Sequence, residues 1–341
     1  MKTVLPIKPE PLYVSRYESA VITGVIQANA ENAGKDISPW LSGLMANYHH
    51  STGFLWQSDT IKDMNWYSGQ KLFKRFSYLY DDRMPGWKRD EISSLIRNSV
   101  FSGQYVHTKA DTFYLPGDSA YKAVHRHVEC LIYGFDEEDS SVLCARFMRT
   151  SPIYLFKVGI DDIVDAIALN EDHRIPLDIL EFNSEFQFTL DEKTLHNDLY
   201  DFLHSTRRYK PMIPDCRIFY GLEALNKYRD YLSLVGEYYD RIDWKYYTSF
   251  VDFQTAAVIR TGYLYKSGYL TDENLLEDAA RLESAKGSFL RCCKEYNSSK
   301  ECRMLTSVIN LFDEIVDIDV KLAESTVKAF QTKNTKPLCL L

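Results

Sequence analysis

The sequence predicts an α+β fold in which one helix comes first, antiparallel strands follow, and the second half is helical. Residues 18–33, "ESAVITGVIQANAENA", have the pattern of a helix that begins at Glu18 and Ser19 and stops before Gly34. Short apolar runs separated by turn residues occupy the middle of the chain. From residue 191 onward, apolar residues recur at helical spacing almost without a break.

Between the first helix and the strands the pattern is mixed. A short helix is expected around residues 39–47, followed by a turn through residues 51–53. The stretches "DMNWYSGQKLFKRFSYLYDD" and "KRDEISSLIRNSVFSG" carry apolar residues at i, i+3 and i+4, and we interpret them as a mixture of strand and helix.

Three short runs in the middle predict strands: "VECLIYGFD", "SVLCARFM" and "PIYLFKVGI". The acidic residues 136–139 join the first two, and we expect them to form the solvated tip of a hairpin. "GIDDIVDAIALN" has helical spacing, with Asp161 and Asp162 suited to a first turn. "ILEFNSEFQFTL" alternates apolar and polar residues and predicts a further strand.

The second half of the chain is predicted to be a helical region. Helices are expected near residues 191–206, 222–237, 243–267, 272–296 and 300–330. We therefore divide the chain into an N-terminal domain, residues 1–185, and a helical C-terminal region, residues 186–341.

Composition excludes several classes of protein. A formal net charge of −8 argues against a nucleic-acid binder, which usually has a basic excess. No apolar run approaches the roughly 18 residues of a membrane-spanning helix, and the prolines near the N-terminus argue against a signal peptide. A cytoplasmic protein is expected. The cysteines lack metal-ligand spacing, and the chain contains no GxGxxG, GxxxxGK[ST], HExxH, CxxC or GxSxG motif.

Two histidines lead into the first of the predicted strands. The segment "HRHVECLIYGFDEEDSSVLCARF" resembles the histidine-bearing strand of bacteriocin-processing peptidases and, more closely, that of the butirosin biosynthesis protein H-like family. The resemblance continues in "GIDDIVDAIA", in "LHNDLYDFLHSTRR" with "IFYGLEALNKYRDYL", and in "TAAVIRTGYLYKSGYL".

This resemblance implies a papain-like cysteine-peptidase fold with a helical C-terminal region. It also implies an acyl- or aminoacyltransferase of antibiotic or nonribosomal peptide biosynthesis, acting on a thioester held by a carrier protein. His127 matches the family's catalytic histidine, and His125, two residues earlier on the same face of an extended chain, is the alternative.

The chain departs from the family pattern at two points. The nucleophilic cysteine has no counterpart, because no cysteine precedes residue 130, and Ser19 is the hydroxyl that could replace it. The acidic residue expected on the strand after the histidine is also missing from "SVLCARFMRT". Two alternatives stay open. One is direct attack of an amine on the thioester with His127 as general base. The other is a catalytically inactive member that binds a carrier protein, an acyl chain or a peptide.

The densest basic patch is "STRRYK", residues 205–210. Arg207, Arg208 and Lys210 could contact the phosphate of a phosphopantetheine arm or an acidic helix of a carrier protein. The expected partners are therefore an acyl or peptidyl carrier protein and a small-molecule or peptide acceptor. Neither nucleic acid nor a membrane is expected as a partner. No bound cofactor is expected, since phosphopantetheine would arrive as the substrate arm of the carrier.

Overall fold

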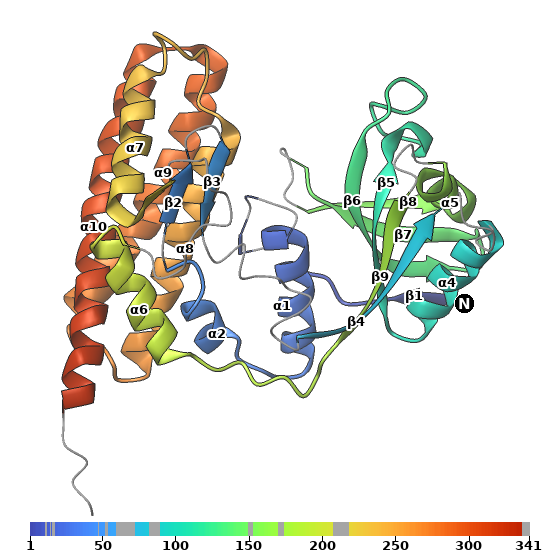
Figure 1. Cartoon of the computed structure of the whole chain (residues 1–341), viewed down its shortest axis with the longest axis horizontal. Coiled ribbons are helices and arrows are strands. Elements are labelled where there is room, and N and C mark those ends of the chain that lie inside the picture. Colours follow the sequence, from blue (N-terminus) through green and yellow to red (C-terminus); the bar gives the residue numbers. More distant parts are fainter. Residues whose placement is uncertain are drawn as a thin grey trace, which may run out of the picture. The chain divides into compact units, whose positions relative to one another are not determined.

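Contacts within the chain cluster in two units, and both are discontinuous in sequence. The computed structural model (Figure 1) describes residues 1–10, 12–13, 15, 18–46, 48–51, 54–58, 72–81, 89–148, 153–169, 174–206 and 218–335. The fold combines helices with an antiparallel sheet, so the predicted α+β class is confirmed. The sheet unit comprises Met1–Lys35 and Asn65–Phe186, and the helical unit comprises Asp36–Met64 and Gln187–Leu341.

A seven-stranded antiparallel sheet forms the centre of the sheet unit. Its described strands are β1 (Lys2–Val4), β4 (Phe73–Asp81), β5 (Tyr105–Asp111), β6 (His127–Asp136), β7 (Ser141–Arg146), β8 (Tyr154–Gly159) and β9 (Arg174–Phe182). The strands lie in the order β4-β9-β5-β6-β7-β8, and β1 adds to β6. β6, β7 and β8 fall on the three predicted runs, whereas β1 and β5 were not predicted.

β5 and β1 pair with the same edge of β6, one after the other along the strand. β5 pairs with β6 as far as Ile132, and β1 takes over at Gly134, after an irregularity in the register. A Cβ atom on Gly134 would lie 2.8 Å from Cδ1 of Leu143 and 3.0 Å from the backbone oxygen of Thr3. Glycine is therefore the residue that lets β1 and β7 both approach β6 at this point.

Two helices cover one face of the sheet, and their apolar residues face it. α4 (Arg89–Phe101) and α5 (Ile160–Ala168) contact each other (Figure 1) and share a core with β5–β9. Ile163 and Ile167 of α5 are fully buried in that core. The sequence predicted this helix from "GIDDIVDAIALN", and the prediction is confirmed. The predicted strand "ILEFNSEFQFTL" is correct only in part, because β9 ends at Phe182.

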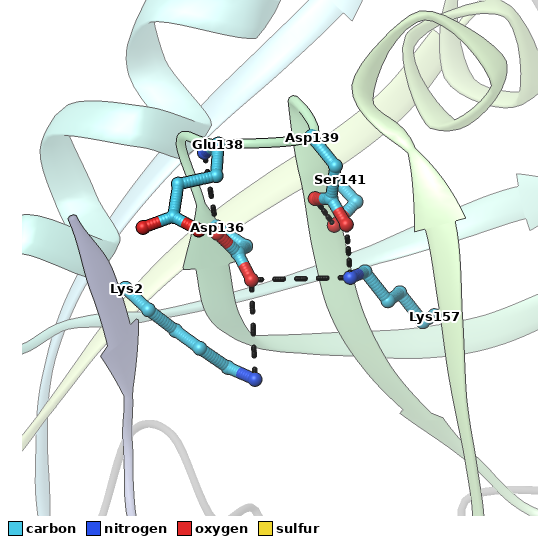
Figure 2. Close-up of polar contacts among 6 residues, drawn as sticks. All are labelled: Lys2, Asp136, Glu138, Asp139, Ser141 and Lys157. Atoms are coloured by element: carbon cyan, nitrogen blue, oxygen red, sulfur yellow. Dashed lines mark hydrogen bonds and ion pairs between the residues drawn. The ribbon is translucent and has the colours of Figure 1, made fainter.

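The acidic turn between β6 and β7 is an ion-pair network (Figure 2). Lys157 of β8 bonds Asp139 and lies 3.8 Å from Asp136. Lys2 of β1 lies 3.9 Å from Asp136 on the other side, and Ser141 donates a hydrogen bond to Asp139. Asp136 is buried, so the expectation of a fully solvated hairpin tip was wrong at this residue.

The helical unit is built from long helices and a small sheet. Its described elements are α2 (Ser38–Ser42), β2 (Tyr48–Ser51), β3 (Phe54–Ser58), α6 (Glu192–Leu203), β10 (Ile218–Tyr220), α7 (Gly221–Leu234), α8 (Trp244–Lys266), α9 (Asn274–Ser299) and α10 (Cys302–Thr335). α8 packs on α9, and α9 packs on α10 (Figure 1). None of the helices in the described part of the chain is long and apolar enough to cross a membrane.

Arg260, buried in the middle of α8, joins the early segment to the helical unit. Its guanidinium donates to the backbone oxygens of Ser42 and Leu44 at 2.9 Å and of Met45 at 3.2 Å. These oxygens lie at and just beyond the C-terminal end of α2, where carbonyl groups lack partners within the helix. This contact helps explain why residues 36–46 pack with helices that lie two hundred residues later.

A buried carboxyl group from α10 lies in the charge environment of Arg260. Burial raises the pKa of Asp319 to about 7, although the charge of Arg260 acts to lower the pKa. An unfolded aspartate has a pKa of about 3.9. The folded state therefore holds a proton that the unfolded state releases, and stability decreases as the pH rises from about 4 to about 7.

We predict that Asp319→Asn removes this loss of stability. The gain in the free energy of unfolding should be small at pH 4 and increase to at most about 4 kcal/mol at pH 8. Urea denaturation across that range measures the gain. Asp317→Asn, an exposed change on the same helix, is the matched control. If both variants show the same pH dependence, Asp319 does not hold the proton.

Candidate functional site

The two histidines from the sequence lie where β6 begins. His127 is the first residue of β6, and its direct cross-strand partner is Asp111, the last residue of β5. His125 lies two residues before the strand, in the connection from β5. Partners in adjacent strands carry their side chains on one face of the sheet. The end of the β5–β6 pair therefore gathers two imidazoles around one carboxylate.

Asp111 uses both carboxylate oxygens. Oδ1 accepts hydrogen bonds from the backbone N–H of Phe113 at 3.0 Å and of Arg126 at 3.1 Å. Oδ2 lies 2.6 Å from Nδ1 of His125. The residue is fully buried, so these donors replace the water that the carboxylate has lost.

The balance of these effects favours the ionised carboxylate. Burial alone would raise the pKa of Asp111, but the hydrogen bonds from His125, Phe113 and Arg126 outweigh it and hold the pKa below its usual range. An ionised Asp111 accepts the Nδ1 proton of His125. It thus leaves Nε2 as the basic nitrogen of the neutral ring.

His125 is better placed for proton transfer than His127. Its ring stacks on Phe113, with centroids 4.2 Å apart and planes 14° from parallel, and Tyr114 lies at the edge of the same group. The side chain is still 35% exposed, so a substrate can reach it. His127 is half-buried, and its Nδ1 atom is inaccessible to solvent.

A buried ion pair holds the connection that carries His125. Asp118, within this connection, lies 2.5 Å from Nη1 of Arg146 at the end of β7, and both side chains are almost fully buried. The guanidinium also lies over the rings of Tyr154 and Phe156 of β8, 5.3 and 5.4 Å from their centroids. The loop is therefore attached to two strands beyond β6.

The first helix is oriented along the same sheet. Asn29, in the C-terminal half of α1 (Thr23–Asn32), donates to the Tyr105 hydroxyl at 2.8 Å, at the end of β5 far from Asp111. Gly24, near the helix start, is in close contact with Ile153, just before β8. β8 begins at the sheet end where β6 also begins, because Tyr154 pairs with Arg146 and Arg146 with Cys130. The N-terminal end of α1 is thus directed toward the histidine end of the sheet.

The sequence-predicted site residues differ in how far the structure describes them. Ser19 belongs to a π-helical turn, Glu18–Ile22, that precedes α1, but its side chain lies outside the described residues. Arg207, Arg208 and Lys210 also lie outside them. The assignments of His127 and Ser19 stay predictions.

The strand after the histidines, β7, carries no carboxylate, as the sequence indicated, but a carboxylate from another strand orients one of the histidines. Asp111 fills that role for His125, from the strand before the histidine rather than the strand after it. Sequence reasoning missed it because β5 was not predicted. The available signal was an aspartate at the end of a short apolar run, followed by a turn that it caps.

A second histidine–aspartate pair lies on the same face of the sheet. His107 of β5 is the cross-strand partner of Asp178 of β9, with Nδ1 3.5 Å from Oδ2, and Arg75 of β4 bonds the same oxygen at 2.8 Å. His107 is buried, which makes it a poorer candidate for contact with substrate. Among the described residues, no three His, Cys, Asp or Glu side chains gather as a metal site requires.

Neither a protein-family model nor a curated protein sequence matches this chain.

We predict that Asp111→Asn destabilises the sheet unit in a pH-dependent way. The lowered pKa of Asp111 means that its contribution is present above the unfolded pKa of about 3.9 and is lost as the pH falls through the folded value. The loss in unfolding free energy, about 1–3 kcal/mol at pH 7, should shrink below pH 4. Urea denaturation at both pH values tests this. An equal loss at pH 7 and pH 3 would contradict the charge-based account.

We also predict opposite effects for two glycine-to-alanine changes in helices. Alanine in a helix interior is usually more stable than glycine by about 1 kcal/mol. A Cβ atom on Gly24 would lie 2.7 Å from the backbone oxygen of Lys8, whereas one on Gly287 of α9 would meet nothing within 4 Å. Gly287→Ala should therefore raise the denaturation midpoint and Gly24→Ala should lower it. A rise for Gly24→Ala would refute the close packing of α1.

Proposed function

We propose that this protein transfers an acyl or aminoacyl group from a carrier-protein thioester to an amine, on a papain-like arrangement of helix and sheet. The observation that carries the proposal is the Asp111–His125 pair, in which a buried carboxylate is hydrogen-bonded to Nδ1 of a partly exposed imidazole. Such a pair is the general-base half of a nucleophile–base–acid site. The direction of α1 supports the proposal, since a papain-like site uses the start of its first helix.

The proposed reaction needs no nucleophile on the protein, because a thioester is already activated. The amine nitrogen attacks the thioester carbonyl, and Nε2 of His125 accepts the proton that the nitrogen loses. The tetrahedral intermediate then breaks its carbon–sulfur bond. The imidazolium returns the proton to the departing thiolate, so an amide and a free thiol leave the site.

The cysteines of the sheet favour this direct attack over an acyl-enzyme. Cys130 and Cys144 lie in the core shared with α4 and α5, on the face of the sheet away from Asp111. Burial raises the pKa of Cys144 well above that of a free thiol, which opposes formation of a nucleophilic thiolate.

The backbone N–H groups at the start of the first helix would stabilise the oxyanion. The first N–H groups of a helix have no partner within the helix, and the helix dipole favours negative charge beside them. Each well-placed donor contributes about 3 kcal/mol in well-studied enzymes. In this scheme the hydroxyl of Ser19 takes no part in bond formation.

We predict that His125→Gln reduces acceptor-dependent thiol release by about 100-fold, because the amine loses its base. Ser19→Ala should retain most of the activity, and His204→Gln, which removes an exposed histidine of the helical unit, is the matched control. The assay mixes the protein with acetyl-pantetheine or a carrier-bound thioester and an amine, and follows free thiol. His127→Gln, measured in parallel, decides which histidine acts.

Intact-mass spectrometry separates direct attack from an acyl-enzyme. No acyl adduct should accumulate on the protein, and an adduct at Ser19 would overturn the direct-attack mechanism. Thioester binding without acceptor-dependent release in any variant would instead support a binding protein without turnover.

A further inference from the structure

The segment that leads to His125 is a continuous exposed surface. All six residues from Tyr121 to Arg126 are exposed. Val124 is 57% exposed and Tyr121 is 36% exposed, so two apolar side chains face solvent beside the candidate base. Exposed apolar residues grouped at a functional site are typical of a contact surface.

The same segment carries two exposed cations, Lys122 and Arg126. The ammonium of Lys122 lies over the ring of Tyr121, 5.1 Å from its centroid. The charge of Arg126 helps to lower the pKa of Asp118, whose direct ion-pair partner is Arg146. The acidic neighbours Asp111 and Asp118 are largely buried and have His125 and Arg146 as their own partners. The charge presented to solvent around His125 is therefore positive, in a chain whose formal net charge is −8.

Lys122 holds its position in an unfavourable backbone conformation. Its φ angle is +52°, in the left-handed region that favours glycine, and its N–H donates to the backbone oxygen of Phe113 at 3.0 Å. Lys300 has a similar φ of +61°, but its ammonium bonds the backbone oxygen of Asp240. Among the described residues, the Lys122 ammonium contacts the Tyr121 ring but has no such hydrogen bond, so it stays available to a partner.

We propose that residues 121–126 are the docking surface for the acidic face of the carrier protein that delivers the thioester. This inference rests on the proposed function and adds the partner's place on the molecule. A carboxylate-lined protein surface would face Lys122 and Arg126, while Tyr121 and Val124 would contact its apolar residues. Charge pairs of this kind accelerate association and orient the partner, here with its thioester beside His125.

Binding can be measured independently of turnover. Fluorescence anisotropy with a labelled, negatively charged acyl carrier protein should show at least a tenfold weaker affinity for the double variant Lys122→Glu, Arg126→Glu. The matched control is Lys294→Glu, Lys328→Glu, the same change in charge at exposed positions of the helical unit, and it should bind as the unaltered protein does. Raising the salt concentration should weaken carrier binding by the unaltered protein. At high salt, the unaltered protein and the double variant should have the same affinity for the carrier.

Measuring turnover with two acyl donors, a carrier-bound thioester and free acetyl-pantetheine, tests this inference separately from the proposed function. The Lys122, Arg126 double variant should lose at least tenfold in kcat/KM for the carrier-bound thioester and keep its activity toward free acetyl-pantetheine. Equal losses with both donors, or unchanged carrier affinity, would overturn the docking surface while leaving the acyl transfer intact. Tighter binding of a single-stranded oligonucleotide that depends on the same two residues would also overturn it.

Lys122→Gly provides a check that does not depend on charge reversal. Glycine adopts a φ of +52° without strain, so the denaturation midpoint should stay the same or rise. Carrier affinity should nevertheless fall, by about threefold or more, because the ammonium is gone. A variant that is destabilised, or that binds the carrier as well as the unaltered protein, would show that Lys122 serves the fold rather than the partner.

Discussion

The geometry of the candidate site depends on the need of one buried carboxylate for hydrogen-bond donors. Asp111 draws its donors from both ends of the β5–β6 connection: Phe113 just after β5, and His125 with Arg126 just before β6. A shift of either end would leave a buried charge without partners, which costs several kcal/mol. The carboxylate therefore determines the loop conformation, and the loop conformation places the imidazole.

The two faces of the sheet have different roles: one packs into the apolar core, and the other carries the candidate site. Successive side chains of a strand point to opposite sides, so one face can be apolar while the other is polar. The face under α4 and α5 carries residues such as Cys130, Cys144 and Leu177. The opposite face carries Asp111 and Asp178 with their histidines. The cysteines remain within the apolar core, which is why the chemistry proposed for the other face relies on nitrogen bases.

The sequence alone predicted the parts of the fold that are encoded by local patterns. α5 follows from helical spacing after a glycine, and β6 and β7 follow from apolar runs around an acidic turn. β1 and β5 were missed because their identity depends on pairing with β6, more than a dozen residues away along the chain for β5 and about 130 for β1. Asp111 was missed with them. The histidines could be found from sequence, but the carboxylate that orients one of them could not.

The anchoring of Ser42, Leu44 and Met45 by Arg260 has a consequence for the order in which the chain can fold during synthesis. The segment leaves the ribosome early, yet its guanidinium partner is made more than two hundred residues later. Until then the carbonyl groups must remain solvated. Likewise, β1 cannot pair before residues 134–136 have been synthesised. A fragment beginning at residue 186 would bury the Arg260 cation without these acceptors, so the helical half should not fold stably when cut out alone.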